Sequence, residues 1–152
     1  MDDDRKRLRV QGSGLLAEAL REHLGGGPEL PAGLTVVARD GWCPDPPERT
    51  DGSPGLTVWT ELDKVVIGPL HTPGVPGCPT CARGRRRRAR PDAAAVAALR
   101  DRHRAELARE PSPWLTESAA HTVAAVVGAD VHLLASGGRP RTAGAPWRSS
   151  TS

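Results

Sequence analysis

The two side chains whose spacing points most directly to chemistry are the thiols of Cys78 and Cys81. Cysteines separated by two residues can hold one face of a tetrahedral zinc ion, and the same spacing also occurs in redox dithiols. A closed zinc site needs two further ligands, and this sequence has no second Cys-x-x-Cys pair. The candidate ligands are a second chain or Cys43, His71, His103, His121 and His132. Zinc is the first candidate for the pair, and structural thiols or a redox pair are the alternatives.

A glycine turn near the start of the chain is the second candidate site. Gly12-x-Gly14-x-x-Ala17 matches the G-x-G-x-x-G/A dinucleotide pattern, in which glycines let a phosphate approach N–H groups at a helix N-terminus. Asp40 is placed where it could hydrogen-bond a ribose. However, Glu18 would oppose an anion, and the separation of Gly12 from Asp40 exceeds the usual ~20 residues. We expect a structural turn without ATP, with nucleotide binding by Gly12, Gly14 and Asp40 as the alternative.

A run of arginines follows the cysteine pair and is the third candidate site. It includes Arg85, Arg86, Arg87 and Arg88, flanked by Arg83 and Arg90. Such a run can bind an acidic leader peptide, the phosphates of a nucleotide or RNA, or an acidic face of a partner protein. The alternative is a solvated linker. No aromatic residue lies between Gly68 and Glu110, so we expect no nucleic-acid partner that binds by base stacking.

The elements that must position these residues begin with a strand, a turn and a helix. Residues 8–11 alternate apolar with polar as in a half-buried strand, and apolar residues recur at helical spacing over 15–24. Residues 34–38 predict a second strand, parallel to the first because a helix intervenes. Residues 56–60 and 64–67 are both strand-like, and their separation suits a strand pair at the sheet edge.

The second half of the chain predicts a loop and two helices. The Pro/Gly-rich loop covers 73–81 and leads into the arginine run. The first helix runs from about Pro91 to Arg109. Its expected inner stripe consists of Val96, Leu99, His103 and Leu107. The second helix runs from Trp114 to about Ser136, with Trp114 as a packing residue at its start.

Composition limits the size of the core. Only 38% of the 152 residues are hydrophobic, and Phe and Tyr are absent, so Leu, Val and Ala must supply most of a lean core. The predicted fold class is α/β: a small Rossmann-like, mostly parallel sheet with flanking helices and long Pro/Gly loops. We expect a flexible lead over 1–7, a single domain over 8–137 and a disordered tail over 138–152.

The cysteine count and the N-terminal residues predict a cytoplasmic protein. Three cysteines, an odd number, argue against a disulfide framework and for a reducing compartment. The acidic start, Met1 to Asp4, has no following apolar run of the kind found in a signal peptide. We also expect no stretch near the ~20 apolar residues that a membrane span needs, and therefore no membrane partner.

A longer segment around the cysteine pair resembles a known signature. Gly68-Pro69-Leu70, then Pro73-Gly74, then Cys78-x-x-Cys81 with arginines after it, is similar to the signature of the ThiF-like domains of thiazole/oxazole-modified microcin biosynthesis. These are cyclodehydratase partner domains that bind leader peptides in bacteriocin pathways. The order of elements over about residues 8–144 agrees with that family. The chain resembles a shortened member, because it has no room for the winged-helix and YcaO regions found beside such domains.

The resemblance implies a ThiF-like fold and an accessory, non-catalytic role. In the family, a YcaO-type cyclodehydratase forms azoline rings in a ribosomally made precursor peptide, and the ThiF-like domain supplies docking or peptide delivery. The implied partners are thus a YcaO protein and its precursor peptide. The implied interface consists of Gly68, Pro69, Pro73, Gly74, Arg85, Arg86, Arg87 and Arg88. The alternatives are an adenylating ThiF-like enzyme that uses ATP and a small zinc-containing interaction module.

Overall fold

A four-stranded sheet forms the centre of the structure, a computed structural model that describes residues 7–30, 33–42, 52–75 and 79–142. The strands lie in the order β1, β2, β3, β4. The first three are parallel, and the fourth pairs antiparallel with the third. Their bounds are β1 (Leu8–Gln11), β2 (Leu34–Arg39), β3 (Gly55–Glu61) and β4 (Lys64–Ile67). The predicted α/β fold with a mostly parallel sheet is confirmed, and so is the strand pair at its edge.

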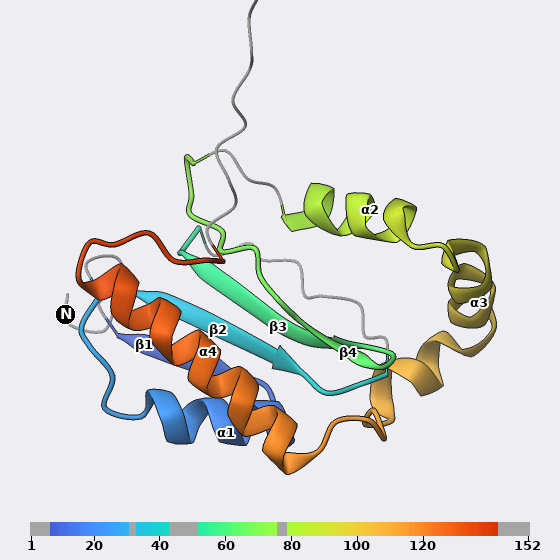
Figure 1. Cartoon of the computed structure of the whole chain (residues 1–152), viewed down its shortest axis with the longest axis horizontal. Helices are drawn as coiled ribbons and strands as arrows, with labels where there is room; N and C mark the ends of the chain where they lie inside the picture. Colours follow the sequence, from blue (N-terminus) through green and yellow to red (C-terminus); the bar gives the residue numbers. More distant parts are fainter. Residues whose placement is uncertain (1–6, 31–32, 43–51, 76–78, 143–152) are drawn as a thin grey trace, which may run out of the picture.

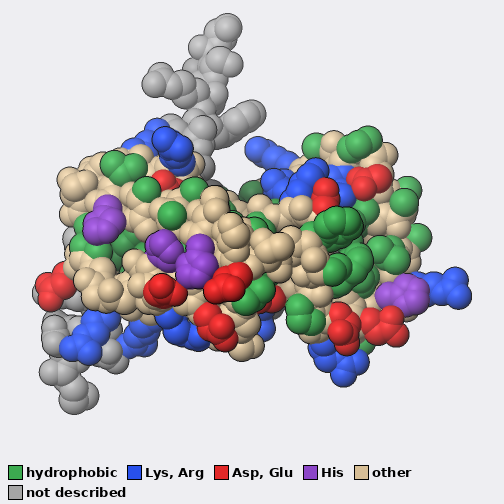
Figure 2. Space-filling view, turned by 60° about the horizontal axis from the view of Figure 1, so that its bottom comes forward, with side chains coloured by type: hydrophobic (Ala, Val, Ile, Leu, Met, Phe, Trp, Pro, Cys, Tyr) green, Lys and Arg blue, Asp and Glu red, His purple; other side chains and the backbone are tan. Residues whose placement is uncertain are grey.

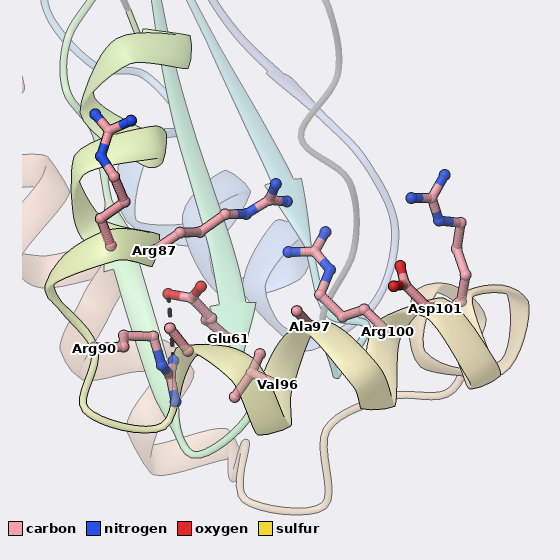
Figure 3. A pocket seen from close by; sticks show the side chains of 10 residues that line it. Glu61, Arg87, Arg90, Val96, Ala97, Arg100 and Asp101 are labelled. Carbon is pink, nitrogen blue, oxygen red and sulfur yellow. Dashed lines mark ion pairs between the residues drawn. The ribbon is translucent and has the colours of Figure 1, made fainter.

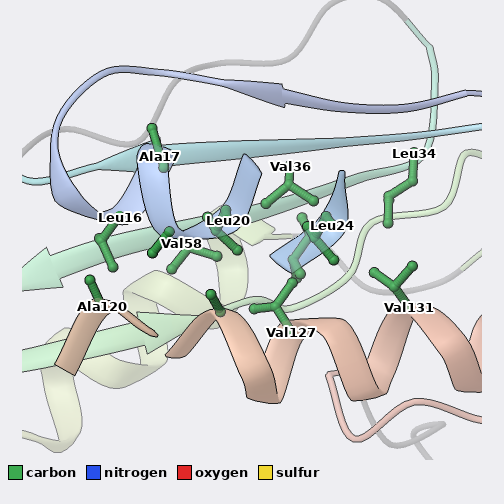
Figure 4. Packing of buried hydrophobic residues seen from close by; sticks show 14 of the residues in the cluster. Leu16, Ala17, Leu20, Leu24, Leu34, Val36, Val58, Ala120, Val127 and Val131 are labelled. Carbon is green, nitrogen blue, oxygen red and sulfur yellow. The ribbon is translucent and has the colours of Figure 1, made fainter. Parts of the chain in front are cut away.

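Two helices from opposite ends of the chain cover one face of this sheet (Figure 1). Helix α1 (Leu15–Leu24) connects β1 to β2, and α4 (Glu117–Ala135) lies along α1. Their buried residues are almost all Leu, Val and Ala, as the composition predicts (Figure 4). From the sheet, Val36 and Val58 point into this layer and are fully buried. The core is therefore a layer of two helices, built from Leu, Val and Ala, packed on one face of the sheet.

Helix α4 begins later than the sequence predicts and has a clear start signal. The side chain of Thr116 accepts a hydrogen bond from the Ala119 N–H at 3.1 Å, as an N-cap residue does. Trp114 lies before this cap and is 66% exposed, so its expected packing role is wrong. By length and mean hydropathy, α4 could cross a membrane, contrary to our expectation that no stretch could. One side of α4 packs on α1 and the sheet, and 28% of its apolar stretch is buried.

The expected loop over 73–81 and the linker after it are replaced in part by a helix. Helix α2 (Pro79–Ala89) contains most of the arginine run and has no buried residue. Proline is well tolerated in the first turn of a helix, and arginine has a high helix propensity, which together favour this start and this body. Helix α2 is therefore a solvent-exposed helix. It has too few apolar residues to show the helical spacing by which a helix is recognised in a sequence.

Helix α3 (Ala93–Arg109) follows at once and departs from its predicted packing. Its backbone is non-helical at His103, where φ is −124°, so the element is kinked. Of the expected inner stripe only Leu107 is buried, and Leu99 is 38% exposed. In Figure 1, α2 and α3 extend beside the sheet and do not cover it. We call the pair the α2–α3 arm.

Candidate functional site

The glycine turn brings Gly12, Gly14 and Asp40 together, as the sequence pattern requires. Gly14 is the N-cap residue of α1 and has no side chain to cap it. Asp40, which follows β2, provides the acceptor instead: the Leu16 N–H lies 3.3 Å from Asp40 Oδ1 and 3.4 Å from Oδ2. A carboxylate far along the chain thus satisfies a free N–H at the start of α1.

Both glycines are required by close packing and by backbone conformation. Gly12 and Gly14 have φ angles of +120° and +90°, which other residues rarely adopt. A Cβ atom at Gly12 would collide with the carbonyl oxygen of Ala38, and one at Gly14 would collide with the Asp40 carboxylate. The close approach of Ala38 and Asp40 is thus a sufficient structural reason for both glycines.

Burial raises the pKa of the Asp40 carboxyl group above its usual value, and the charge of Glu18 acts in the same direction. The hydrogen bonds from the backbone of Leu16 and Leu15 lower the pKa and only partly offset this effect. A phosphate at the N-terminus of α1 would meet the negatively charged Asp40 carboxylate, which already accepts the hydrogen bond of the Leu16 N–H group. The residues present do not fit a phosphate in the manner of a dinucleotide site.

The Gly-Pro-Leu segment continues the line of β4 and packs into the fold. The Gly68 N–H donates to the Thr57 carbonyl at 2.9 Å, and His71 exchanges two 2.8 Å backbone hydrogen bonds with Gly55. Gly68 is buried, has a φ of +81° and precedes a cis peptide bond to Pro69. This part of the predicted interface thus connects the end of β4 to β3 through backbone hydrogen bonds.

Pro73 and Gly74 have a different environment and lie on the surface. The Val75 N–H donates to the Thr72 carbonyl at 3.1 Å, which closes a turn around these two residues. Gly74 has a φ of +77° and open space around it, as a Pro-Gly turn requires. Pro73 and Gly74 are exposed. They remain available for a partner, unlike Gly68.

The residues that follow α4 are held in the fold by a buried carboxylate. Asp130 is 3% exposed, and its carboxylate accepts hydrogen bonds from the backbone N–H groups of Arg141 at 3.3 Å and Thr142 at 3.0 Å. The Thr142 carbonyl in turn accepts from the Leu70 N–H at 2.9 Å. The first residues of the expected tail, through Thr142, are therefore attached to the Gly-Pro-Leu segment, and 143–152 lie outside the described residues.

Only one residue of the cysteine pair falls within the described part of the chain. Cys81 lies in the first turn of α2 and is exposed, whereas Cys78 and Cys43 lie outside the described residues. Among the residues that the structure describes, no three His, Cys, Asp or Glu side chains are grouped as metal ligands. The zinc site stays a prediction. The helical position of Cys81 corrects the expectation that a loop surrounds it.

The α2–α3 arm is joined to the sheet by a buried glutamate that the sequence analysis did not single out. Glu61, at the end of β3, is 5% exposed. Its Oε2 lies 3.4 Å from Arg86 Nη2 and 3.8 Å from Arg90 Nη1. Arg90 also makes a bidentate pair with Asp92, with distances of 2.8 and 2.9 Å. This pairing raises the pKa of Arg90 and lowers that of Asp92, so both stay charged.

A hollow of about 310 Å³ lies between α2 and α3, above Glu61. Figure 3 shows Glu61 between arginines of α2 and the small apolar residues of α3. The lining residues are Glu61, Arg87, Arg88, Arg90, Ala93, Val96, Ala97, Arg100, Asp101 and Arg104. We call this hollow the arm pocket. It combines five guanidinium groups, two carboxylates and an apolar wall.

The predicted interface residues are distributed over three elements. Gly68 and Pro69 belong to the sheet edge, Pro73 and Gly74 form a surface turn, and Arg85 to Arg88 are exposed on α2. Of the four arginines, Arg87 and Arg88 line the arm pocket, and Arg86 approaches Glu61. The signal for Glu61 was present in the sequence: it is an acidic residue that ends an otherwise uncharged strand.

Comparison with solved structures shows where a similar fold occurs. No known protein family and no curated protein match the chain. A solved structure described as a heterocyclase in complex with substrate and cofactor has a similar fold, with a TM-score of 0.53 and 21% sequence identity. The similarity covers 93% of this chain and 21% of that protein, so the chain spans about a fifth of its length. The two share a fold over nearly all of this chain.

Proposed function

We propose that this chain is an accessory partner of a YcaO-type cyclodehydratase, which forms azoline rings in a ribosomally synthesised precursor peptide. The observation that carries the proposal is the likeness of fold to part of a heterocyclase over 93% of the chain. The resemblance of the segment from Gly68 to Cys81 to the signature of ThiF-like partner domains supports the same assignment. These two lines of support are independent, because one rests on backbone shape and the other on a short motif.

The proposed role is binding and delivery, with the ring-forming chemistry on the cyclodehydratase. The glycine turn supports this division, because Asp40 accepts the N–H group that a bound phosphate would need. The exposed arginines of α2 and the surface turn at Pro73 and Gly74 offer positions where a partner can bind. The protein would then act by positioning a peptide and an enzyme relative to one another, which raises the effective concentration of substrate.

Reconstitution tests this proposal directly. The cyclodehydratase and its precursor peptide are incubated with ATP, with or without this chain, and loss of one water per ring is followed by mass spectrometry. We expect ring formation to fall sharply when the chain is omitted. Heat-denatured chain is the control, and it should not restore the rate. An unchanged rate without the chain would remove the proposal.

A further inference from the structure

The arm pocket has a composition that distinguishes it from the rest of the surface. Its lining includes Arg87 and Arg88 of α2, Arg100 and Arg104 of α3, and Arg90, which lies close to Glu61. The lining carries more positive than negative charge. Positive potential in a hollow with low-dielectric walls is focused, so this pocket attracts carboxylates more strongly than scattered arginines would.

The base and the wall of the pocket restrict which anions fit. Glu61 is buried against the pocket and opposes any anionic group, phosphate or carboxylate, that would enter fully, so ligand carboxylates are expected on the outer arginines. Ala93, Val96 and Ala97 form an apolar wall, which favours a ligand that also carries hydrocarbon. Figure 2 shows hydrophobic side chains bordered by basic and acidic ones on the arm side of the molecule. The matching ligand has both carboxylates and an apolar side chain.

The size of the pocket favours a short linear ligand. A volume of about 310 Å³ is at the lower end of ligand pockets and holds only a few side chains. A stable interface between two folded proteins would need roughly 800 Å² on each partner. No aromatic side chain lines the pocket, so it lacks the stacking surface that a single-stranded nucleic acid would use. A short peptide segment is therefore the occupant that fits.

We infer that the arm pocket binds an acidic segment of the precursor peptide, with an apolar side chain against Val96 and Ala97 and carboxylates on the surrounding arginines. This deepens the proposed function and rests on it for the source of the peptide. Arg86 and Arg90 have a positioning role, since their contacts with Glu61 hold α2 beside the end of β3.

The test compares two double variants of equal charge in the full chain. Arg87→Glu with Arg104→Glu changes one lining residue on each helix. Arg102→Glu with Arg109→Glu makes the same charge change at two exposed positions of α3 outside the lining. Binding is measured by fluorescence anisotropy with short labelled peptides composed of Glu and Leu, Lys and Leu, or Glu and Gly. Circular dichroism establishes that both variants are folded.

We expect the Glu/Leu peptide to bind wild-type protein, and the pocket variant to weaken that binding about tenfold or more, as loss of two close charge pairs should. The control variant should weaken it much less, and the other two peptides should bind poorly. Equal loss in both variants would overturn the inference, because it would indicate diffuse attraction. Equal binding of the Glu/Gly peptide would overturn it as well, because the apolar wall would have no role.

The ring-forming assay separates this inference from the proposed function. If ring formation requires the chain but the pocket variant supports the full rate, the inference fails and the proposed function stands. If peptide binding depends on the pocket but ring formation does not require the chain, the proposed function fails. If the pocket variant loses its binding to the cyclodehydratase while it still binds the precursor peptide, the pocket belongs to the enzyme and the inference fails.

Discussion

Replacement of Asp40 tests how a carboxylate outside a helix supports the start of that helix. Asp40→Ala removes the acceptor of the Leu16 N–H, whereas Asp40→Asn keeps an oxygen acceptor and removes the charge. Loss of an N-cap acceptor costs about 0.5–2 kcal/mol in the free energy of unfolding. The observed distances of 3.3 and 3.4 Å are longer than usual for such bonds. We therefore expect the alanine variant to be about 0.5–1 kcal/mol less stable than the asparagine variant.

The pH dependence of the same position follows from the raised pKa of Asp40. A folded-state pKa above the ordinary 3.8 means that the native protein binds the proton more tightly than the unfolded chain does. The charged carboxylate therefore lowers stability at neutral pH, and this penalty disappears as the pH falls through the folded pKa toward 3.8. Relative to Asp40→Asn, the wild type should gain stability as the pH is lowered from 7.

Urea denaturation between pH 4 and 7, followed by circular dichroism, measures these differences. Asp63→Asn is the matched control, since Asp63 is an exposed carboxylate in the turn between β3 and β4. The reasoning is refuted if the difference between wild type and Asp40→Asn is constant over this pH range. It is also refuted if the alanine and asparagine variants are equally stable at neutral pH, because the hydrogen bond would then contribute nothing.

Three further predictions concern backbone strain, the C-terminal segment and zinc. Gly14→Ala should lower the free energy of unfolding by about 1–3 kcal/mol, from both a left-handed φ and a collision with a carboxylate, and should cost more than Gly26→Ala, which has a similar φ but open space. Asp130→Ala should expose the residues that it holds, so that trypsin cuts faster after Arg141, while an unchanged rate of cleavage at that bond would contradict this. If the cysteine pair binds zinc, elemental analysis should find the metal in protein purified without chelator, and both Cys78→Ser and Cys81→Ser should lose it.

The part of the fold that could be predicted from the sequence is the part with strong local periodicity. The strands and α1 alternate or repeat their apolar residues because each buries one face, and their positions agree with the structure to within about two residues. The absence of Phe and Tyr also predicted the kind of core that is found. In these elements, local pattern and tertiary packing favour the same conformation.

The elements that could not be predicted are those held by long-range polar contacts. Helix α2 has no apolar face, so its sequence gives no periodic signal. The Asp130 carboxylate holds residues that composition alone assigns to a tail. A ribose contact was the alternative role for Asp40, because the pattern shows an acidic residue after a strand but cannot show that the N-terminus of a neighbouring helix already uses its carboxylate. Such contacts depend on which segments meet in space, and local sequence does not contain that information.

The placement of the α2–α3 arm separates the surface that we propose for peptide binding from the part of the chain that keeps the protein folded. The core is closed by α1 and α4, and the arm is an excursion between β4 and α4 that buries little. The entropy of closing such an excursion grows only slowly with its length. Substitutions, insertions or exchanges within the arm can therefore alter the proposed peptide selectivity at little thermodynamic cost to the rest of the molecule, so that selectivity can change in evolution without a rebuilt core.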